Sequence, residues 1–146
     1  MTEKDNSSIR AQISRNAVAL ISLVVAVGSL GYNTWRNELT EANRNVRSAG
    51  FQLMNEIAKL QQVVLLSHYD MDDVRGNPRV GWTHVIAIKD LAYSMPADVQ
   101  TACDDLFLVW QDNWDSLANT PASLDKIDSS INNAKGKILR AIEALD

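Results

Sequence analysis

The sequence predicts an all-α protein in which an N-terminal transmembrane helix continues into an antiparallel four-helix bundle. An uncharged run of twenty residues occupies positions 16–35. After it, apolar residues recur at steps of three and four, and no alternating run typical of a strand appears. We therefore expect a short polar tail over residues 1–15, a transmembrane helix over residues 16–35 and a helical-bundle domain over residues 36–146.

The uncharged segment is long enough to cross a bilayer, because a helix rises about 1.5 Å per residue and the hydrocarbon core is about 30 Å thick. Its eight strongly apolar residues contribute about −2.5 to −5 kcal/mol on the insertion scale, which polar residues and glycines reduce. Tyr32 and Trp35 stand at one end, where aromatic rings favour the headgroup region, and Arg15 and Arg36 bracket the segment. The alternative is a cleaved signal peptide, since basic residues precede an apolar stretch that ends in small residues.

The orientation rests on a weaker signal, because three basic residues precede the span and three follow it closely. A short head before a first span usually stays in the cytoplasm. We therefore expect a single-pass protein of the bacterial inner membrane with its C-terminal domain in the periplasm. Small residues such as Ser22 and Ala26, four apart in the span, are compatible with pairing of two copies.

Charge, cysteine content and sequence motifs exclude several classes of function. Eleven lysines and arginines stand against sixteen aspartates and glutamates after residue 15, so the domain is acidic and we expect no nucleic-acid binding. Cys103 is the single cysteine, so no intrachain disulfide is possible. No sequence motif for a nucleophile, a zinc protease, a phosphate-binding loop or a dinucleotide is found, and we expect neither an enzyme nor a cofactor.

Prolines mark where the expected helices begin. A long first helix runs from about Ile13 to Tyr69, and Asn77-Pro78 and Thr120-Pro121 each pair a capping residue with a proline at the first helical position. Pro96 restarts the chain between a second helix that reaches about residue 94 and a third that reaches about residue 118. Each expected helix has one buried face. In chain order, these faces carry Leu39, Ala42, Val46, Ala49, Leu53, Ile57, Leu60 and Val64; Trp82, Val85, Ile88, Ala92 and Met95; Val99, Cys103, Leu106, Trp110 and Leu117; and Leu124, Ile127, Ile131, Ala134, Ile138, Ala141 and Leu145.

A cluster of histidines and carboxylates follows the first core helix. His68, Asp70, Asp72 and His84, with Asp73 beside them, are residue types that bind divalent transition metals. The spacing does not identify a metal site, because residues two apart do not share a helix face. The alternative is a solvated acidic turn in which His68 extends the apolar seam four residues beyond Val64.

The connection RGNPRVGW is the candidate recognition site. Arg75, Asn77, Arg79 and Trp82 surround a helix N-terminus, which can hold an anion. The structural alternative is a simple helix start, with Trp82 packed over the end of the bundle and an arginine paired with a nearby aspartate. We consider both interpretations open.

Two residues of the expected third helix, Trp114 and Asn113, have alternative interpretations, and Cys103 has one. Trp114 is either a core residue or an exposed interface anchor, since tryptophan is common among binding hot spots. Asn113 lies near the buried face. It is either a buried polar residue that fixes the register of the helices or an amide on the surface. Cys103 lies within the apolar seam, which predicts an inert buried thiol.

The segment from Thr40 to Leu66, with its EANRNVR run, and the loop RGNPRVGW resemble those of small single-span inner-membrane proteins of proteobacteria. This resemblance implies an inner-membrane setting and carries no activity or site residues. The leading hypothesis is a non-enzymatic, membrane-anchored interaction or scaffold protein of the cell envelope. Its partners would be the lipid bilayer and another envelope protein or a second copy of itself. The alternative is a sensory accessory protein that binds a ligand or metal between residues 68 and 82.

Overall fold

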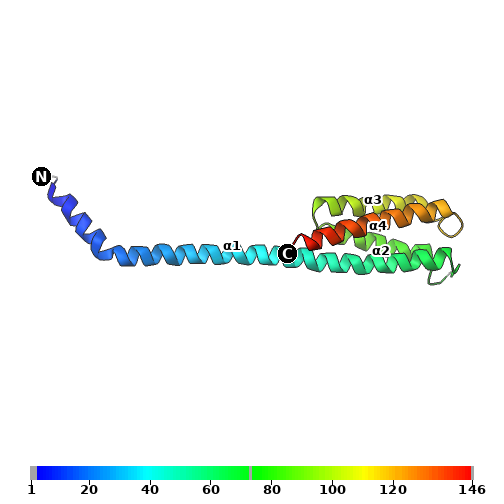
Figure 1. Ribbon diagram of the computed structural model, residues 1–146, viewed down its shortest axis with the longest axis horizontal. Helices are drawn as coiled ribbons and strands as arrows, with labels where there is room; N and C mark the ends of the chain where they lie inside the picture. The colour runs from blue at the N-terminus through cyan, green and yellow to red at the C-terminus, as the bar shows by residue number, and fades with distance from the viewer. Residues whose placement is uncertain (1–2, 73, 146) are drawn as a thin grey trace. The chain divides into compact units, whose positions relative to one another are not determined.

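The computed structural model describes residues 3–72 and 74–145, and every regular element among them is an α-helix. The helices are α1 (Glu3–His68), α2 (Pro78–Ala92), α3 (Ala97–Asn113) and α4 (Pro121–Glu143) (Figure 1). The all-α prediction is therefore confirmed. The chain divides into two compact units, Met1–Ala42 and Asn43–Asp146, so the first helix contributes to both.

The described residues of the first unit all belong to α1, and its large apolar side chains from residue 18 onward are exposed. The exposed fractions of these residues run from 48% for Leu39 to 77% for Val18. The rings of Tyr32 and Trp35 contact each other with centroids 6.2 Å apart. Within the described residues, α1 is the one helix that is long and apolar enough to cross a membrane.

The second unit is built around one hydrophobic core to which all four helices contribute. Burial on α1 begins at Ala49, after the half-buried Val46, whereas Leu39 and Ala42 are exposed. The prediction that these two residues belong to the buried seam is therefore wrong. The largest fully buried side chains are Trp110, Leu53, Ile57, Leu60, Ile88, Leu106, Leu117, Ile127, Ile131, Ile138, Val85 and Val99.

Two glycines allow close approach of helices in this core. A Cβ atom built on Gly81 of α2 would overlap Cζ2 and Cη2 of Trp110, so only glycine leaves room for the indole. A Cβ on Gly50 of α1 would lie 2.7 Å from Cδ1 of Ile142, near the end of α4. The bare glycine backbone thus lets α2 pack against the largest side chain of α3.

The starts of α2 and α4 follow the predicted signals, but α1 begins at Glu3, before the predicted start near Ile13, and two helices end earlier than predicted. Asn77 caps α2, since its side-chain oxygen accepts a hydrogen bond from the Arg79 backbone N–H at 3.0 Å, and Pro78 opens the helix. Thr120 occupies the equivalent position before Pro121 but makes no side-chain cap bond. The second helix ends at Ala92 and the third at Asn113, two and five residues earlier than predicted.

Candidate functional site

The connection between α1 and α2 is organised by the carboxylate of Asp72. Its Oδ1 accepts hydrogen bonds from the backbone N–H groups of Val74 and Arg75 at 3.0 and 2.8 Å, and its Oδ2 pairs with Nε of Arg75 at 2.7 Å. The N–H of Arg75, followed by its side chain, lowers the pKa of Asp72 below its usual value. This geometry matches the structural alternative for the loop, in which an arginine is paired with a nearby aspartate.

Two of the four predicted ligand-binding residues share a hollow at this end of the domain. Asn77 and Arg79 line a surface hollow of about 440 Å³, whose wall also includes Ser67, Met71, Asp72, Gly76, Pro78, Ala118 and Asn119. Arg75, whose side chain pairs with Asp72, is not among the lining residues. The structure therefore brings half of the predicted set to one hollow.

Trp82, the fourth member of that set, packs on aromatic neighbours. Its ring lies edge-on to Phe107, with centroids 5.6 Å apart, and to Trp114, with centroids 6.3 Å apart. Trp82 and Trp114 are both half-buried against the core. The aromatic contacts join α2 to the end of α3, and they hold Trp114, the predicted interface anchor, beside the core.

The two histidines of the predicted metal cluster have separate partners. Nδ1 of His68 lies 2.8 Å from the Leu117 carbonyl oxygen, and Nδ1 of His84 lies 2.8 Å from Oε2 of Glu56. Asp70 is exposed, and Asp73 lies outside the described residues. Among the residues that the structure does describe, no three His, Cys, Asp or Glu side chains are grouped so as to hold a metal ion. The metal site remains a prediction.

Glu56 and His84 form a link between α1 and α2 that sequence reasoning missed. Oε1 of Glu56 accepts a hydrogen bond from Nζ of Lys59 at 2.7 Å while Oε2 faces the imidazole, and both partners of the Glu56–His84 pair are largely buried. These hydrogen bonds, that from Lys59 first, lower the pKa of Glu56. The residues are 28 positions apart, so no local motif announces the pair.

Three buried groups on α3 bear on chemistry. Cys103 is fully buried, and burial raises the pKa of its thiol to about 12, which disfavours the reactive thiolate. Asn113 is buried and donates its side-chain amide to the Val109 carbonyl of its own helix at 2.8 Å. Nε1 of the buried Trp110 has no hydrogen-bond partner within the described part of the chain.

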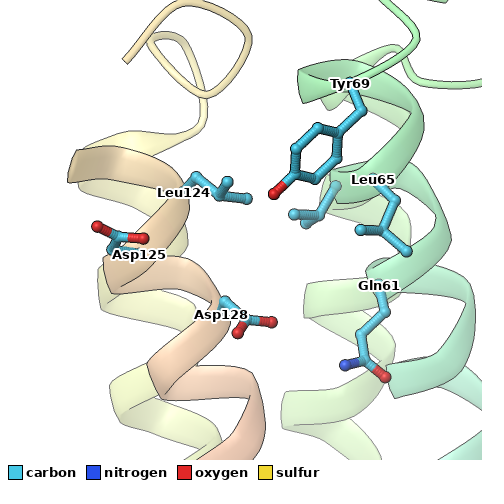
Figure 2. A pocket seen from close by; sticks show the side chains of 7 residues that line it. Gln61, Leu65, Tyr69, Leu124, Asp125 and Asp128 are labelled. Atoms are coloured by element: carbon cyan, nitrogen blue, oxygen red, sulfur yellow. The ribbon is translucent and has the colours of Figure 1, made fainter. Parts of the chain in front are cut away.

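A second hollow lies between α1 and α4, and sequence reasoning did not find it. We call it the α1–α4 groove; it has a volume of about 310 Å³ and is lined by Gln61, Val64, Leu65, Tyr69, Leu124, Asp125 and Asp128. Figure 2 shows the Tyr69 ring reaching toward Leu124, with Gln61 and Asp128 facing each other across the gap and the carboxylate of Asp125 on the other side of α4 in this view. Only a weak signal in the sequence indicates this groove, namely that the large residues Leu65 and Tyr69 lie outside the apolar seam.

Comparisons of the chain with protein-family models, with curated proteins and with solved structures found no match.

Proposed function

We propose that the chain is a membrane-anchored, non-enzymatic interaction or scaffold protein of the bacterial cell envelope. One apolar helix over residues 16–35 holds it in the inner membrane. An antiparallel four-helix bundle, on the periplasmic side, binds another envelope protein or a second copy of the chain. The observation that carries this proposal is the uncovered apolar surface of the first unit.

That surface is unfavourable in water. Ten large apolar or aromatic side chains between residues 18 and 35 are each at least 49% exposed. Apolar area left in water costs about 25 cal/mol per Å², whereas the bilayer interior removes this cost and leaves the helix backbone satisfied by its own hydrogen bonds. The Tyr32–Trp35 pair and the flanking Arg15 and Arg36 are of the types that prefer the membrane–water interface.

The antiparallel bundle is supported by the connections and by contacts between helices. Connections of a few residues make consecutive helices antiparallel neighbours. Ion pairs join neighbouring helices, with Lys89 of α2 at 3.3 Å from Asp104 of α3 and Lys137 of α4 at 3.3 Å from Asp98 of α3. The Glu56–His84 pair joins α1 to α2 in the same way.

The placement of the reactive residue types favours interaction over catalysis. The Cys103 thiol is buried with a raised pKa, and both imidazoles are engaged, His68 by a backbone carbonyl and His84 by Glu56. A nucleophile or general base must reach a substrate, whereas the thiol is fully buried and both imidazoles are part-buried. Their contacts stabilise the domain.

The alternative is a sensory accessory protein that binds a small ligand at the end of the domain near α2. The specific observation in its favour is the hollow of about 440 Å³ lined by Asn77 and Arg79, since pockets of about 300–1,000 Å³ accommodate small molecules. The engagement of Arg75 by Asp72 weakens this alternative, because it removes one of two cations from the site.

Insertion of one charge into the span tests the anchor. Val24→Arg should release the chain from membranes, because an arginine near the centre of a span costs about 2.5–3.5 kcal/mol, comparable with the whole insertion energy. The matched control is Leu108→Arg on α3, where the parent leucine is 54% exposed. Flotation of cell membranes after carbonate washing is the measurement. If Val24→Arg floats as the parent does, the anchor is wrong.

Crosslinking in native membranes tests the interaction. We expect the chain to be recovered in a defined complex, either with one other envelope protein or as a homo-oligomer. A strictly monomeric chain with nothing crosslinked to it would contradict the proposal. A reporter fused after Asp146 assigns the side of the membrane, and activity on the cytoplasmic side would reverse the proposed orientation.

A further inference from the structure

We infer that the α1–α4 groove receives a lysine or arginine side chain of a partner polypeptide. This inference rests on the proposed function and specifies where the partner docks and what it must present. The groove combines an apolar floor, an exposed aromatic ring and the carboxylate of Asp128 at its edge (Figure 2). Its volume of about 310 Å³ is large enough for one long side chain.

The chemistry of the lining matches an amphipathic cation. Val64, Leu65 and Leu124 offer apolar contact to an aliphatic stem, and lysine and arginine bury such stems while their charged ends reach polar groups. Asp128 faces the gap and can accept hydrogen bonds from the charged end. The Tyr69 ring, which reaches across the groove, can stack on the same cation.

Asp125 and Asp128, like Asp90, Asp105, Asp112 and Asp115, form no ion pair with another described residue; what distinguishes Asp128 is its place beside an apolar groove. Asp98 pairs with Lys137 and Asp104 pairs with Lys89. Within residues 3–72 and 74–145, by contrast, no ion pair to Asp125 or Asp128 is formed; Asp128 accepts only a neutral hydrogen bond from Nδ2 of Asn132, at 3.0 Å. The negative charge is therefore left for an external partner.

Two local explanations for these charges do not account for them. The positive end of a helix dipole favours aspartate within the first turn, but Asp125 and Asp128 lie beyond the first turn of α4, which begins at Pro121. Lys126 lines a different hollow, to which Asp125 also contributes, so Asp128 is the carboxylate that lines the α1–α4 groove but not the hollow of Lys126. Like charges at this spacing repel each other slightly, so a cation beside Asp128 would relieve the repulsion.

Exposed apolar residues continue from the groove into the following connection. Leu65 and Tyr69 are 54% and 67% exposed, and Met71 and Val74, just beyond them in sequence, are 68% and 81% exposed. Met71 has φ +48°, a left-handed conformation rarely adopted by residues other than glycine. A partner that inserts a cation beside Tyr69 would find apolar surface for its flanking residues, which is the usual arrangement around an interface anchor.

A titration of the full chain in nonionic detergent micelles, with 13C-labelled leucine and valine methyl groups, tests the inference. The probe is the blocked tripeptide acetyl-Leu-Arg-Leu-amide, and its counterpart carries neutral citrulline in place of arginine. We expect the arginine peptide to shift the methyl resonances of Val64, Leu65 and Leu124. The citrulline peptide should bind about tenfold more weakly, because it loses the charge-assisted hydrogen bonds.

Variants locate the effect. Asp128→Asn should weaken binding of the arginine peptide about tenfold and remove the preference over citrulline, whereas Asp112→Asn, at an exposed position on α3 outside the groove, should leave both unchanged. Equal binding of the two peptides, or shifts centred on Leu108 instead, would overturn the inference. If the titration fails while crosslinking in membranes still yields a defined complex, the groove alone is rejected. If the chain is found monomeric or detached from membranes, the proposed function is rejected whatever the titration shows.

Discussion

Two stretches of the same helix, α1, use apolar residues in different ways. Over residues 18–35 the apolar side chains lie on all sides and are exposed, whereas over residues 49–64 most of them recur at steps of three and four and are buried, with Phe51 as the large exposed exception. An apolar stripe on one face of a helix is buried by packing against other helices. A helix that is apolar on every face requires an apolar environment all around it, such as the interior of a bilayer. The pattern around the helix, more than the number of apolar residues, therefore indicates what covers each stretch.

The largest expected difference comes from the same truncation in each stretch. Leu53→Ala should lower the free energy of unfolding of the domain by about 2–5 kcal/mol, because Leu53 is fully buried and its removal leaves a cavity. Leu23→Ala, on a residue 60% exposed in the apolar segment, should leave that free energy unchanged. Urea denaturation in detergent, followed by tryptophan fluorescence, measures both. Similar losses from the two variants would mean that residues 18–35 belong to the cooperative fold of the domain.

Glycine-to-alanine substitutions in the domain and in the apolar segment extend the comparison of their packing. Gly81→Ala should destabilise the domain by about 1–3 kcal/mol, since the new Cβ meets the indole of Trp110 and forces it to move. Gly28→Ala in the apolar segment meets no atom within 4 Å and should not change the unfolding of the domain.

The control for both glycine variants is Gly136→Ala on α4. Its Cβ also has open space, and alanine is favoured over glycine inside a helix by about 1 kcal/mol, so this variant should stabilise the domain. Thermal unfolding by circular dichroism compares the three variants. An unchanged melting temperature for Gly81→Ala would show that the close approach of α2 to Trp110 is not required.

The starts of α2 and α4 and most of the core could be predicted because their causes are local, whereas α1 begins at Glu3 and no capping signal led to that start. Pro78 and Pro121 fix the first helical position, and periodic residues such as Ile131 and Ile138 are buried as expected. The end of α3 was predicted too late because Leu117 fits the apolar spacing and is indeed buried, but in a turn. There Ser116 bonds to the Asn113 carbonyl and to the Ser123 hydroxyl, and such side-chain hydrogen bonds compete with helix formation.

The candidate site was less accessible from sequence because its contacts join distant residues. The Asp72–Arg75 pairing is local and was among the expected alternatives. The Glu56–His84 pair and the α1–α4 groove depend on how α2 and α4 are rotated about their axes against α1, which no spacing along the chain specifies. The order of the helices follows from periodicity, but the pairing of polar side chains between them requires the packed structure.

The smallest expected effect concerns two glutamates of α1, one in each unit. Hydrogen bonds from Lys59 and His84 lower the pKa of Glu56, so this carboxylate stabilises the fold above the usual glutamate range, and the stabilisation is lost as the pH falls through the lowered value. Glu56→Gln should therefore cost about 1 kcal/mol at pH 7 and reduce the loss of stability on acidification below about pH 4.5. Glu41→Gln, at an exposed position of the first unit, is the matched control. Denaturation curves between about pH 3 and 7 make the comparison; if the two variants follow the same pH dependence, the Glu56–His84 link does not stabilise the packing of α2 on α1.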